Sequence, residues 1–245
     1  MNTSLQEATA LAQSIMNTLE KESNEVTIIL CPPFPYLLSA KTLLGHGSLI
    51  RVGAQNCSQH TSGAFTGEVS AGMLRSMEIP YVIIGHSERR QYFNEDSGLL
   101  AQKIDVALAN GLVPIFCCGE PLEVREAGNQ EALVKKQVEE SLFHLSAEAL
   151  KNVVIAYEPV WAIGTGKTAT SSQAQDMHLV VRNHIAQKYG NATAQSIPIL
   201  YGGSVKADNA AELFACADVD GGLVGGASLK ASEFVAIVRS AIRPI

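Results

Sequence analysis

Short apolar runs without polar alternation recur along the chain. They are rich in valine and isoleucine and occupy residues 26–30, 50–54, 81–84, 112–117, 153–157, 197–201 and 222–224. An apolar run of this length is typical of a strand that is buried on both faces, as in a parallel sheet. The pattern therefore predicts seven buried strands.

Amphipathic stretches alternate with these strands. Apolar positions at helical spacing predict helices over residues 4–19, 35–44, 69–77, 99–110, 131–145, 172–189, 209–217 and 232–242. A strand followed by a helix, in units of about thirty residues, is the pattern of repeated βαβ units. Eight helices accompany seven strands, because the helix pattern at 4–19 has no strand ahead of it.

The number of units separates a closed barrel from an open sheet. Eight βα units in 245 residues match the size of a TIM (β/α)8 barrel. We therefore expect an α/β fold, a TIM barrel whose first β-strand is absent from this chain. No linker, low-complexity segment or composition shift divides the sequence, so we expect a single domain over residues 1–245.

Composition and charge exclude several classes of protein. Hydrophobic residues make up 47% of the chain and charged residues 17%, which is too apolar for a disordered protein. No apolar run approaches the ~18 residues of a membrane-spanning helix, and the first twenty residues do not resemble a secretory signal. The net charge of −6 comes without any lysine- or arginine-rich run. We expect a cytoplasmic protein that binds neither membrane nor nucleic acid.

The cysteines point to reduced thiols. The chain has five, and none of their spacings suggests a disulfide framework or a metal site, so we expect no metal. Cys117 and Cys118 are adjacent in a predicted strand, where successive side chains face opposite sides. One of them should face the barrel interior and the other a covering helix.

Glu158 directly follows the predicted strand at 153–157. Enzymes with this fold place their catalytic groups at the C-terminal ends of the strands. Residues 159–167 combine the stiff Pro159 and Trp161 with flexible glycines, the composition of a lid that closes on hinges. The alternative is an ordinary surface loop that carries a solvated glutamate.

His86 follows the predicted strand at 81–84, which places it at the same face as Glu158. A histidine alone at such a position is more often structural, but a second proton-handling group nearby favours catalysis. We expect Ser87 and Glu88 to cap a helix that begins here. A helix N-terminus pointing at the imidazole would favour its neutral form.

The loop at residues 55–68 is long for a connection between a strand and a helix, and such loops are usually functional. Phe65, beside Thr66 near the loop tip, would be costly to leave in water, so we expect it to dock on a partner. A loop folded back on its own barrel is the alternative. We also expect the arginines at 89–90 to bind loop carboxylates such as Glu68.

Glycine pairs end the last two strands, within 201–204 and 221–226. Barrels commonly bind a phosphate at this place through backbone N–H groups. Each pair alone is more often a tight turn. Both pairs together with Gly164 from the lid segment favour a phosphate site.

Taken together, these segments resemble the triosephosphate isomerase family. Its motifs GHSERR, CCGE, YEPVWAIGTGK, YGGSV and GLVGGASL occur in order across almost the whole chain. The resemblance implies that dihydroxyacetone phosphate and D-glyceraldehyde 3-phosphate are interconverted, as in glycolysis and gluconeogenesis, without cofactor or metal. It implies that Glu158 moves a proton between the two carbons, while neutral His86 polarises the carbonyl and moves protons between the oxygens.

The resemblance also implies binding roles. The family's phosphate-binding backbone and hydroxyl groups correspond to Gly164, Ser204, Gly225 and Gly226. The loop at 55–68, with Phe65 and Thr66, corresponds to the one that inserts into the other subunit of a homodimer. Closure of the lid would keep water from the enediolate, whose phosphate is otherwise eliminated.

The chain departs from the family pattern at its N-terminus. The family's first strand ends in G-N-W-K-M-N, of which Met1 and Asn2 match the last two residues. The strand and its substrate-binding lysine are missing, and loss of such a preorganised group typically costs ~3 kcal/mol or more. Because Met1 lies inside the motif, we expect the natural start to lie further upstream. The dimer is in doubt as well, since the partner's loop docks near the missing segment.

Two other functions stay open. The first is a barrel that binds or assembles but is impaired or non-catalytic, because the lysine is absent. The second is another phosphate-binding barrel enzyme, for instance of tryptophan or histidine biosynthesis. Such an enzyme would share the glycine-rich site but would have no reason to carry YEPVWAIGTGK.

Overall fold

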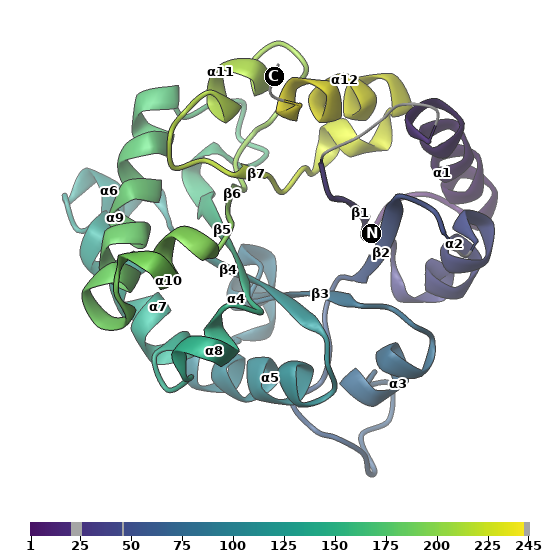
Figure 1. Cartoon of the computed structure of the whole chain (residues 1–245), viewed down its shortest axis with the longest axis horizontal. Helices are drawn as coiled ribbons and strands as arrows, with labels where there is room; N and C mark the ends of the chain where they lie inside the picture. The colour runs from purple at the N-terminus through teal and green to yellow at the C-terminus, as the bar shows by residue number, and fades with distance from the viewer. Residues whose placement is uncertain (21–25, 46, 243–245) are drawn as a thin grey trace.

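The computed structural model describes residues 1–20, 26–45 and 47–242, which form a sheet surrounded by helices (Figure 1). The sheet has seven strands, each parallel to and paired with the next in the chain. The strands are β1 (Ile28–Leu30), β2 (Ile50–Ala54), β3 (Tyr81–Ile84), β4 (Val113–Glu120), β5 (Val154–Pro159), β6 (Ile199–Tyr201) and β7 (Gly221–Gly222). All seven predicted strands are confirmed in place and order.

Helices form the outer layer of the ring. The longer ones are α1 (Leu5–Leu19), α2 (Leu37–Leu44), α5 (Ser97–Ala109), α7 (Gln130–Leu142), α9 (Ser171–Tyr189) and α12 (Ala231–Ala241). The shorter ones are α3 (Ala71–Ser76), α4 (Ser87–Phe93), α6 (Leu122–Glu126), α8 (Ala147–Leu150), α10 (Asn191–Ser196) and α11 (Ala210–Phe214). Three 3₁₀ turns complete the set: η1 (Phe34–Tyr36), η2 (Val160–Ala162) and η3 (Gly226–Leu229). Every predicted helix is present, and α6, α8 and α10 are additional.

Alternate side chains of the strands fill two separate apolar layers. Ile83, Ile115, Cys117 and Ala156 form a cluster of their own inside the ring. The larger core includes Phe116 and Cys118 and lies between the strands and the helices. This division confirms that Cys117 and Cys118 face opposite sides of the sheet. All five cysteines are free thiols, as expected.

The layer of helices closes around the sheet, but the sheet itself is open. Helix α1 packs against α12, so the first and last helices are neighbours (Figure 1). Strands β1 and β7 are the two ends of the strand order, and within the described ranges no pairing joins them. This arrangement confirms the expected fold class, a TIM barrel without its first strand.

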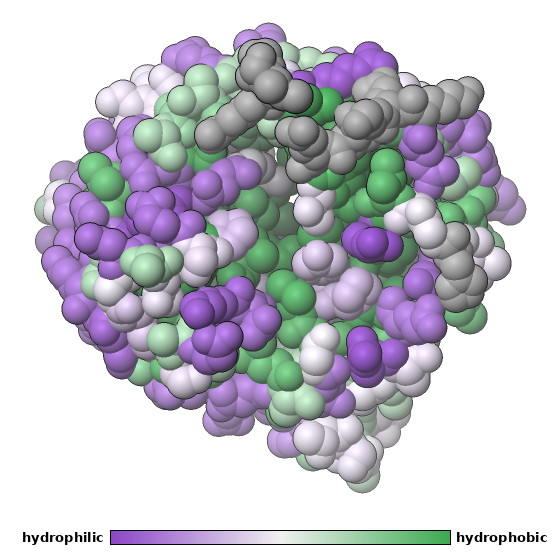
Figure 2. All heavy atoms as spheres, viewed as in Figure 1, coloured by the Kyte–Doolittle hydropathy of each residue, from purple (hydrophilic) through white to green (hydrophobic). Residues whose placement is uncertain are grey.

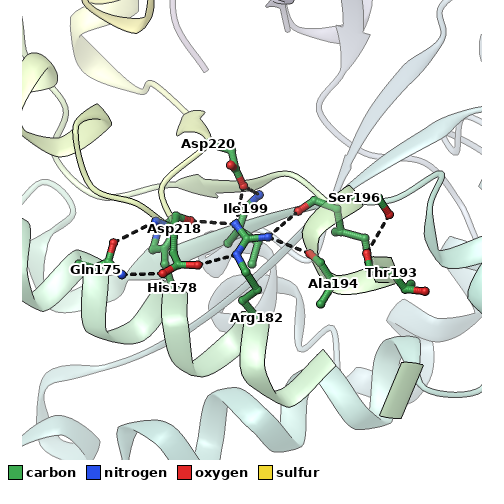
Figure 3. Close-up of polar contacts among 10 residues, drawn as sticks. Gln175, His178, Arg182, Thr193, Ala194, Ser196, Ile199, Asp218 and Asp220 are labelled. Carbon is green, nitrogen blue, oxygen red and sulfur yellow. Dashed lines mark hydrogen bonds and ion pairs between the residues drawn. The ribbon is translucent and has the colours of Figure 1, made fainter. Parts of the chain in front are cut away.

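A buried arginine on α9 joins the last strands to the helical layer (Figure 3). Arg182 binds the carboxylates of Asp218 and Asp220, both at 2.7 Å. It also donates to the carbonyl oxygen of Ala194 at 2.8 Å. Asp220 in turn accepts the N–H of Ile199 at 2.8 Å, so the network fixes the beginning of β6 and the approach to β7. Because the Arg182 side chain is only 5% exposed, loss of these carboxylates would leave a largely buried charge without its partners.

None of the helices described is both long and apolar enough to cross a lipid bilayer. In the same part of the chain, no three or more histidine, cysteine, aspartate or glutamate side chains are grouped so that they could hold a metal ion.

Candidate active site

Glu158 lies next to the end of β5 and is almost fully buried, with 1% of its surface exposed. Its carboxylate accepts the backbone N–H of Ser87 at 2.9 Å and the Ser87 hydroxyl at 3.2 Å. The Nε2 atom of His86 lies 3.1 Å from its Oε1. The structure therefore brings together the two candidate proton-handling residues, which come from neighbouring parts of the ring.

His86 is itself the N-cap of α4. Its Nδ1 accepts the backbone N–H of Glu88 at 3.3 Å, so this nitrogen carries no proton and the ring hydrogen is on Nε2. The prediction that Ser87 and Glu88 cap the helix was wrong. Ser87 is the first residue of α4 and turns its hydroxyl to Glu158, while Glu88 supplies only its N–H to the cap.

Burial changes the acidity of Glu158. Its pKa is raised above the ordinary value because desolvation penalises the charged carboxylate. Interactions with His86, Ser87 and Arg90 favour the charged form and oppose this rise in pKa, without cancelling it. A carboxylate with a raised pKa is a stronger base than one in solvent.

The segment after Glu158 is anchored at both ends and exposed between them. At the first end, Trp161 Nε1 donates to Oε1 of the buried Glu120 at 2.8 Å. At the other end, Thr170 forms a capping box at the beginning of α9. Residues 164–168 between these anchors are exposed. Gly164 and Gly166 have positive φ angles of 67° and 80°, a backbone conformation that favours glycine.

Glu120 is a shared acceptor beneath this segment. The same Oε1 atom also accepts the Tyr157 hydroxyl at 3.0 Å and binds Arg125 at 3.0 Å. The guanidinium of Arg125 lies 4.9 Å from the centre of the Trp161 ring. Sequence analysis noted Glu120 only within the motif CCGE and gave it no role. Two of its three donors, Tyr157 and Trp161, are distant from it in the sequence.

The glycine pairs after β6 and β7 differ in what they contact. A Cβ atom at Gly202 would lie 2.9 Å from Cγ of Glu158, and one at Gly203 would lie 2.2 Å from the Tyr201 hydroxyl. Packing therefore requires these two glycines. Gly225 and Gly226 face open space, with no heavy atom within 4 Å of a Cβ at either position.

The other predicted phosphate-binding residues lie at the ends of these connections. Gly164 is exposed in the segment after Glu158 and, like the second pair, faces open space. Ser204 is half-buried, and its carbonyl oxygen accepts the side-chain N–H of Asn209 at 3.0 Å. Gly225 and Gly226 begin η3, the short helical turn after β7. The backbone N–H groups of Gly164, Gly225 and Gly226 thus lie in open segments.

The loop at residues 55–68 keeps its aromatic tip partly in solvent. Phe65 is 42% exposed, and Thr66 is exposed. The Phe65 ring stacks on His60 of the same loop, with 3.6 Å between centroids. A groove of about 270 Å³ lies beside the loop and extends to Phe93 on α4.

The expectation that the arginines of α4 bind loop carboxylates is confirmed for Arg89, whose partner lies in the loop between α4 and α5, but not for Arg90. Arg89 binds a carboxylate at 2.7 Å, but this is Glu95 and not Glu68. Arg90 binds no carboxylate and donates instead to the backbone oxygens of Gly85 and Cys117. Sequence analysis missed this role because backbone acceptors leave no mark on the amino-acid sequence.

A buried lysine supports the same region. Lys103 on α5 binds Glu95 at 2.6 Å and the Asn56 side chain at 2.9 Å. It therefore ties the base of the 55–68 loop to the segment after α4. Its position among the apolar residues of α5 gave a weak signal, since a lysine there needs a buried partner.

The hydropathy of the visible face differs between the centre of the ring and its rim. Figure 2 shows hydrophobic residues around the middle of the visible face and hydrophilic residues over much of the rim.

The family model described as "Triosephosphate isomerase" matches residues 1–241. The chain belongs to the triosephosphate isomerase family.

Curated relatives agree with this family over nearly the whole chain. A triosephosphate isomerase from Cytophaga hutchinsonii is 53% identical over 241 residues, which are 98% of this chain and 95% of the relative. One from Bacteroides fragilis is 52% identical over 238 residues, 97% of this chain and 94% of the relative. One from Chlorobium phaeovibrioides is 48% identical, with 98% and 95% covered.

The triosephosphate isomerase fold explains why these residues meet. His86 comes just after β3 and Glu158 lies at the C-terminal end of β5, and parallel strands of a barrel end at one face. Among the contacts that the structure describes for these two side chains, none comes from a lysine.

Proposed function

We propose that this chain interconverts dihydroxyacetone phosphate and D-glyceraldehyde 3-phosphate. The observation that carries the proposal is the contact between a buried carboxylate, Glu158, and a neutral imidazole, His86, at 3.1 Å. Isomerisation of an aldose to a ketose needs one group that moves a proton between carbons and another that serves the oxygens. The two side chains match these two tasks.

Glu158 is the base in this proposal. Its carboxylate removes a proton from the carbon next to the carbonyl, and the electrons of that C–H bond form the double bond of an enediolate. The protonated carboxyl then returns a proton to the neighbouring carbon. The raised pKa of Glu158 supports this role, because a stronger base takes a carbon-bound proton more readily.

His86 serves the oxygens. Its Nε2 atom, which lies 3.1 Å from the Glu158 carboxylate, can donate a proton to the substrate carbonyl and stabilise the charge that develops there. A neutral imidazole gives up this proton to one oxygen and recovers a proton from the other. Ser87 and Glu88 support the arrangement, the first by holding the resting carboxylate and the second through its N–H on Nδ1.

The open glycines and the anchored segment complete the proposed site. We infer that Gly164, Ser204, Gly225 and Gly226 bind the phosphate, mainly through backbone N–H groups. Open space beside the three glycines supports this inference. The exposed residues 164–168 act as the lid and exclude water, which protects the enediolate from loss of phosphate.

Conversion of dihydroxyacetone phosphate in D₂O, followed by ¹H NMR, tests the function and the proton transfer together. A proton held on a carboxyl group exchanges with solvent, so we expect glyceraldehyde 3-phosphate labelled with deuterium at C2. Conversion with only hydrogen at C2 that continues unchanged in the Glu158→Gln variant would contradict the role of Glu158. No conversion by the folded chain would contradict the proposed function and favour the non-catalytic barrel.

We also propose that the protein is a homodimer that works in the cytoplasm. The exposed Phe65 and the groove that extends to Phe93 support an interface at the 55–68 loop. The five free thiols support a reducing compartment.

Light scattering after size-exclusion chromatography tests the dimer. We expect twice the mass of one chain, and a shift toward the monomer in the Phe65→Ser variant. Leu179→Ser on α9 is the matched control, because Leu179 is also 42% exposed but lies away from the loop. A monomeric wild-type chain would contradict the proposal.

A further inference from the structure

Arg90 joins two strands at the point where their pairing ends. The last pair between β3 and β4 is Ile84 with Phe116. The next residue on each strand, Gly85 and Cys117, presents its carbonyl oxygen to the Arg90 guanidinium. Nε donates to Gly85 at 2.9 Å and Nη2 donates to Cys117 at 2.8 Å.

The space for this guanidinium depends on a glycine. A Cβ atom at Gly85 would lie 2.8 Å from Cδ1 of Leu100, 3.2 Å from the Cys117 oxygen and 3.4 Å from Nη2 of Arg90, so it would crowd the pocket that holds the guanidinium. Gly85 also has a positive φ of 79°, which turns the chain out of β3. The guanidinium lies over the Phe116 ring, 5.7 Å from its centre. Contacts with Gly85, Cys117 and Phe116 therefore fix the position of the Arg90 guanidinium.

This position connects the two residues of the proposed acid–base pair. On one side, Gly85 directly precedes His86. On the other side, Cys117 belongs to β4, whose Gly119 pairs with Glu158 of β5. The two hydrogen bonds of Arg90 thus link the backbone that carries His86 to the strand that pairs with the backbone of Glu158.

We propose that Arg90 is a positioning residue, which sets the separation of His86 and Glu158 by holding the Gly85 and Cys117 backbones together through its charged guanidinium. This inference rests on the proposed isomerase function. The role needs a planar group with several donors, because one lysine ammonium cannot reproduce the two-armed contact. It also needs the charge, which lysine keeps and methionine removes.

The charge has a separate signature in the pH profile. Arg90 favours the charged form of Glu158 and so opposes the rise in pKa that burial causes. The other titratable groups that face Glu158 are His86 at the beginning of α4 and the thiols of Cys117 and Cys118 on β4. Burial raises the pKa of both thiols, to about 12 for Cys118, so they stay neutral near pH 7.

The test compares Arg90→Lys and Arg90→Met with the wild-type chain, using glyceraldehyde 3-phosphate as substrate. We expect kcat to fall about 10- to 100-fold in both variants, because geometry is lost in both, while KM changes less than about threefold. The acid limb of kcat/KM should stay in place for Arg90→Lys. It should move to higher pH for Arg90→Met, because the carboxylate loses a favourable charge.

Arg182→Lys is the matched control, since Arg182 also binds backbone oxygens but lies outside the proposed site. We expect it to lower the free energy of unfolding and to leave the kcat of the folded enzyme and the acid limb unchanged. The inference is overturned if the control changes the pH profile as Arg90→Met does, or if Arg90→Lys keeps kcat within twofold. If Arg90→Met does not fold, the kcat of Arg90→Lys alone decides whether the inference holds. A wild-type chain without turnover overturns the proposed function and this inference together.

Discussion

At the scale of single residues, the partners of Glu158 set its basicity and the position of its carboxylate. Ser87 binds the Glu158 carboxylate through both its N–H and its hydroxyl, so the carboxylate must leave these bonds to reach a substrate. Glu158 and His86 were predictable because each lies within two residues of the end of an apolar run that predicts a strand. Arg90 was not, because its partners are backbone oxygens.

Ser87→Ala tests this balance at the residue scale. The Ser87 hydroxyl favours the charged carboxylate and lowers the pKa of Glu158. Its removal should therefore raise that pKa and move the acid limb of kcat/KM to higher pH, which steady-state kinetics across the pH range will measure. Ser87→Thr keeps a hydroxyl and serves as the control. An acid limb that stays in place or moves to lower pH in Ser87→Ala would refute the argument.

At the scale of elements, apolar periodicity located the strands well and the short helices poorly. The bounds of β2 and β3 match the prediction residue for residue. Helices α6, α8 and α10 have four to six residues, which is too few for a helical period to show. The anchors of the lid could not be predicted, because Glu120 collects Tyr157, Trp161 and Arg125 only after folding.

Glu120→Gln tests the first anchor of the lid. The neutral amide weakens three contacts, so we expect the free energy of unfolding to fall by about 2 kcal/mol or more. Trp161 is the only tryptophan of the chain, and its fluorescence should shift to longer wavelength as the ring gains exposure to water. Glu126→Gln on the same helix as Arg125 is the control, since Glu126 is exposed. Unchanged emission and stability in Glu120→Gln would contradict the anchor.

At the scale of the whole molecule, the helices close a ring that the strands leave open. Alternation of strands and helices predicted the class of fold and the strand order. The packing of α1 on α12 was not predictable, because it depends on how far the sheet curls. Within the described residues β1 and β7 are the edges of the sheet, and the backbone groups of such edges are a cost that one more parallel strand would remove.

A strand added before Met1, with the family's G-N-W-K ending, should therefore stabilise the fold. We expect a higher free energy of unfolding in denaturant and, through the added lysine, turnover higher by about 10²-fold or more. The same extension with methionine in place of its lysine should keep the stability and lose most of the gain in turnover. An extended chain that is neither more stable nor more active would show that the open edges are not a deficit.

The most direct test of the account is the turnover of glyceraldehyde 3-phosphate by the purified chain and its Glu158→Gln variant. Glutamine preserves the shape of the side chain but cannot accept a proton from carbon, so we expect measurable turnover in the wild type and a loss of about 10²- to 10⁴-fold in the variant. Thermal unfolding of both proteins shows that the variant is folded. A folded wild-type chain without turnover, or a variant that retains it, would contradict the account.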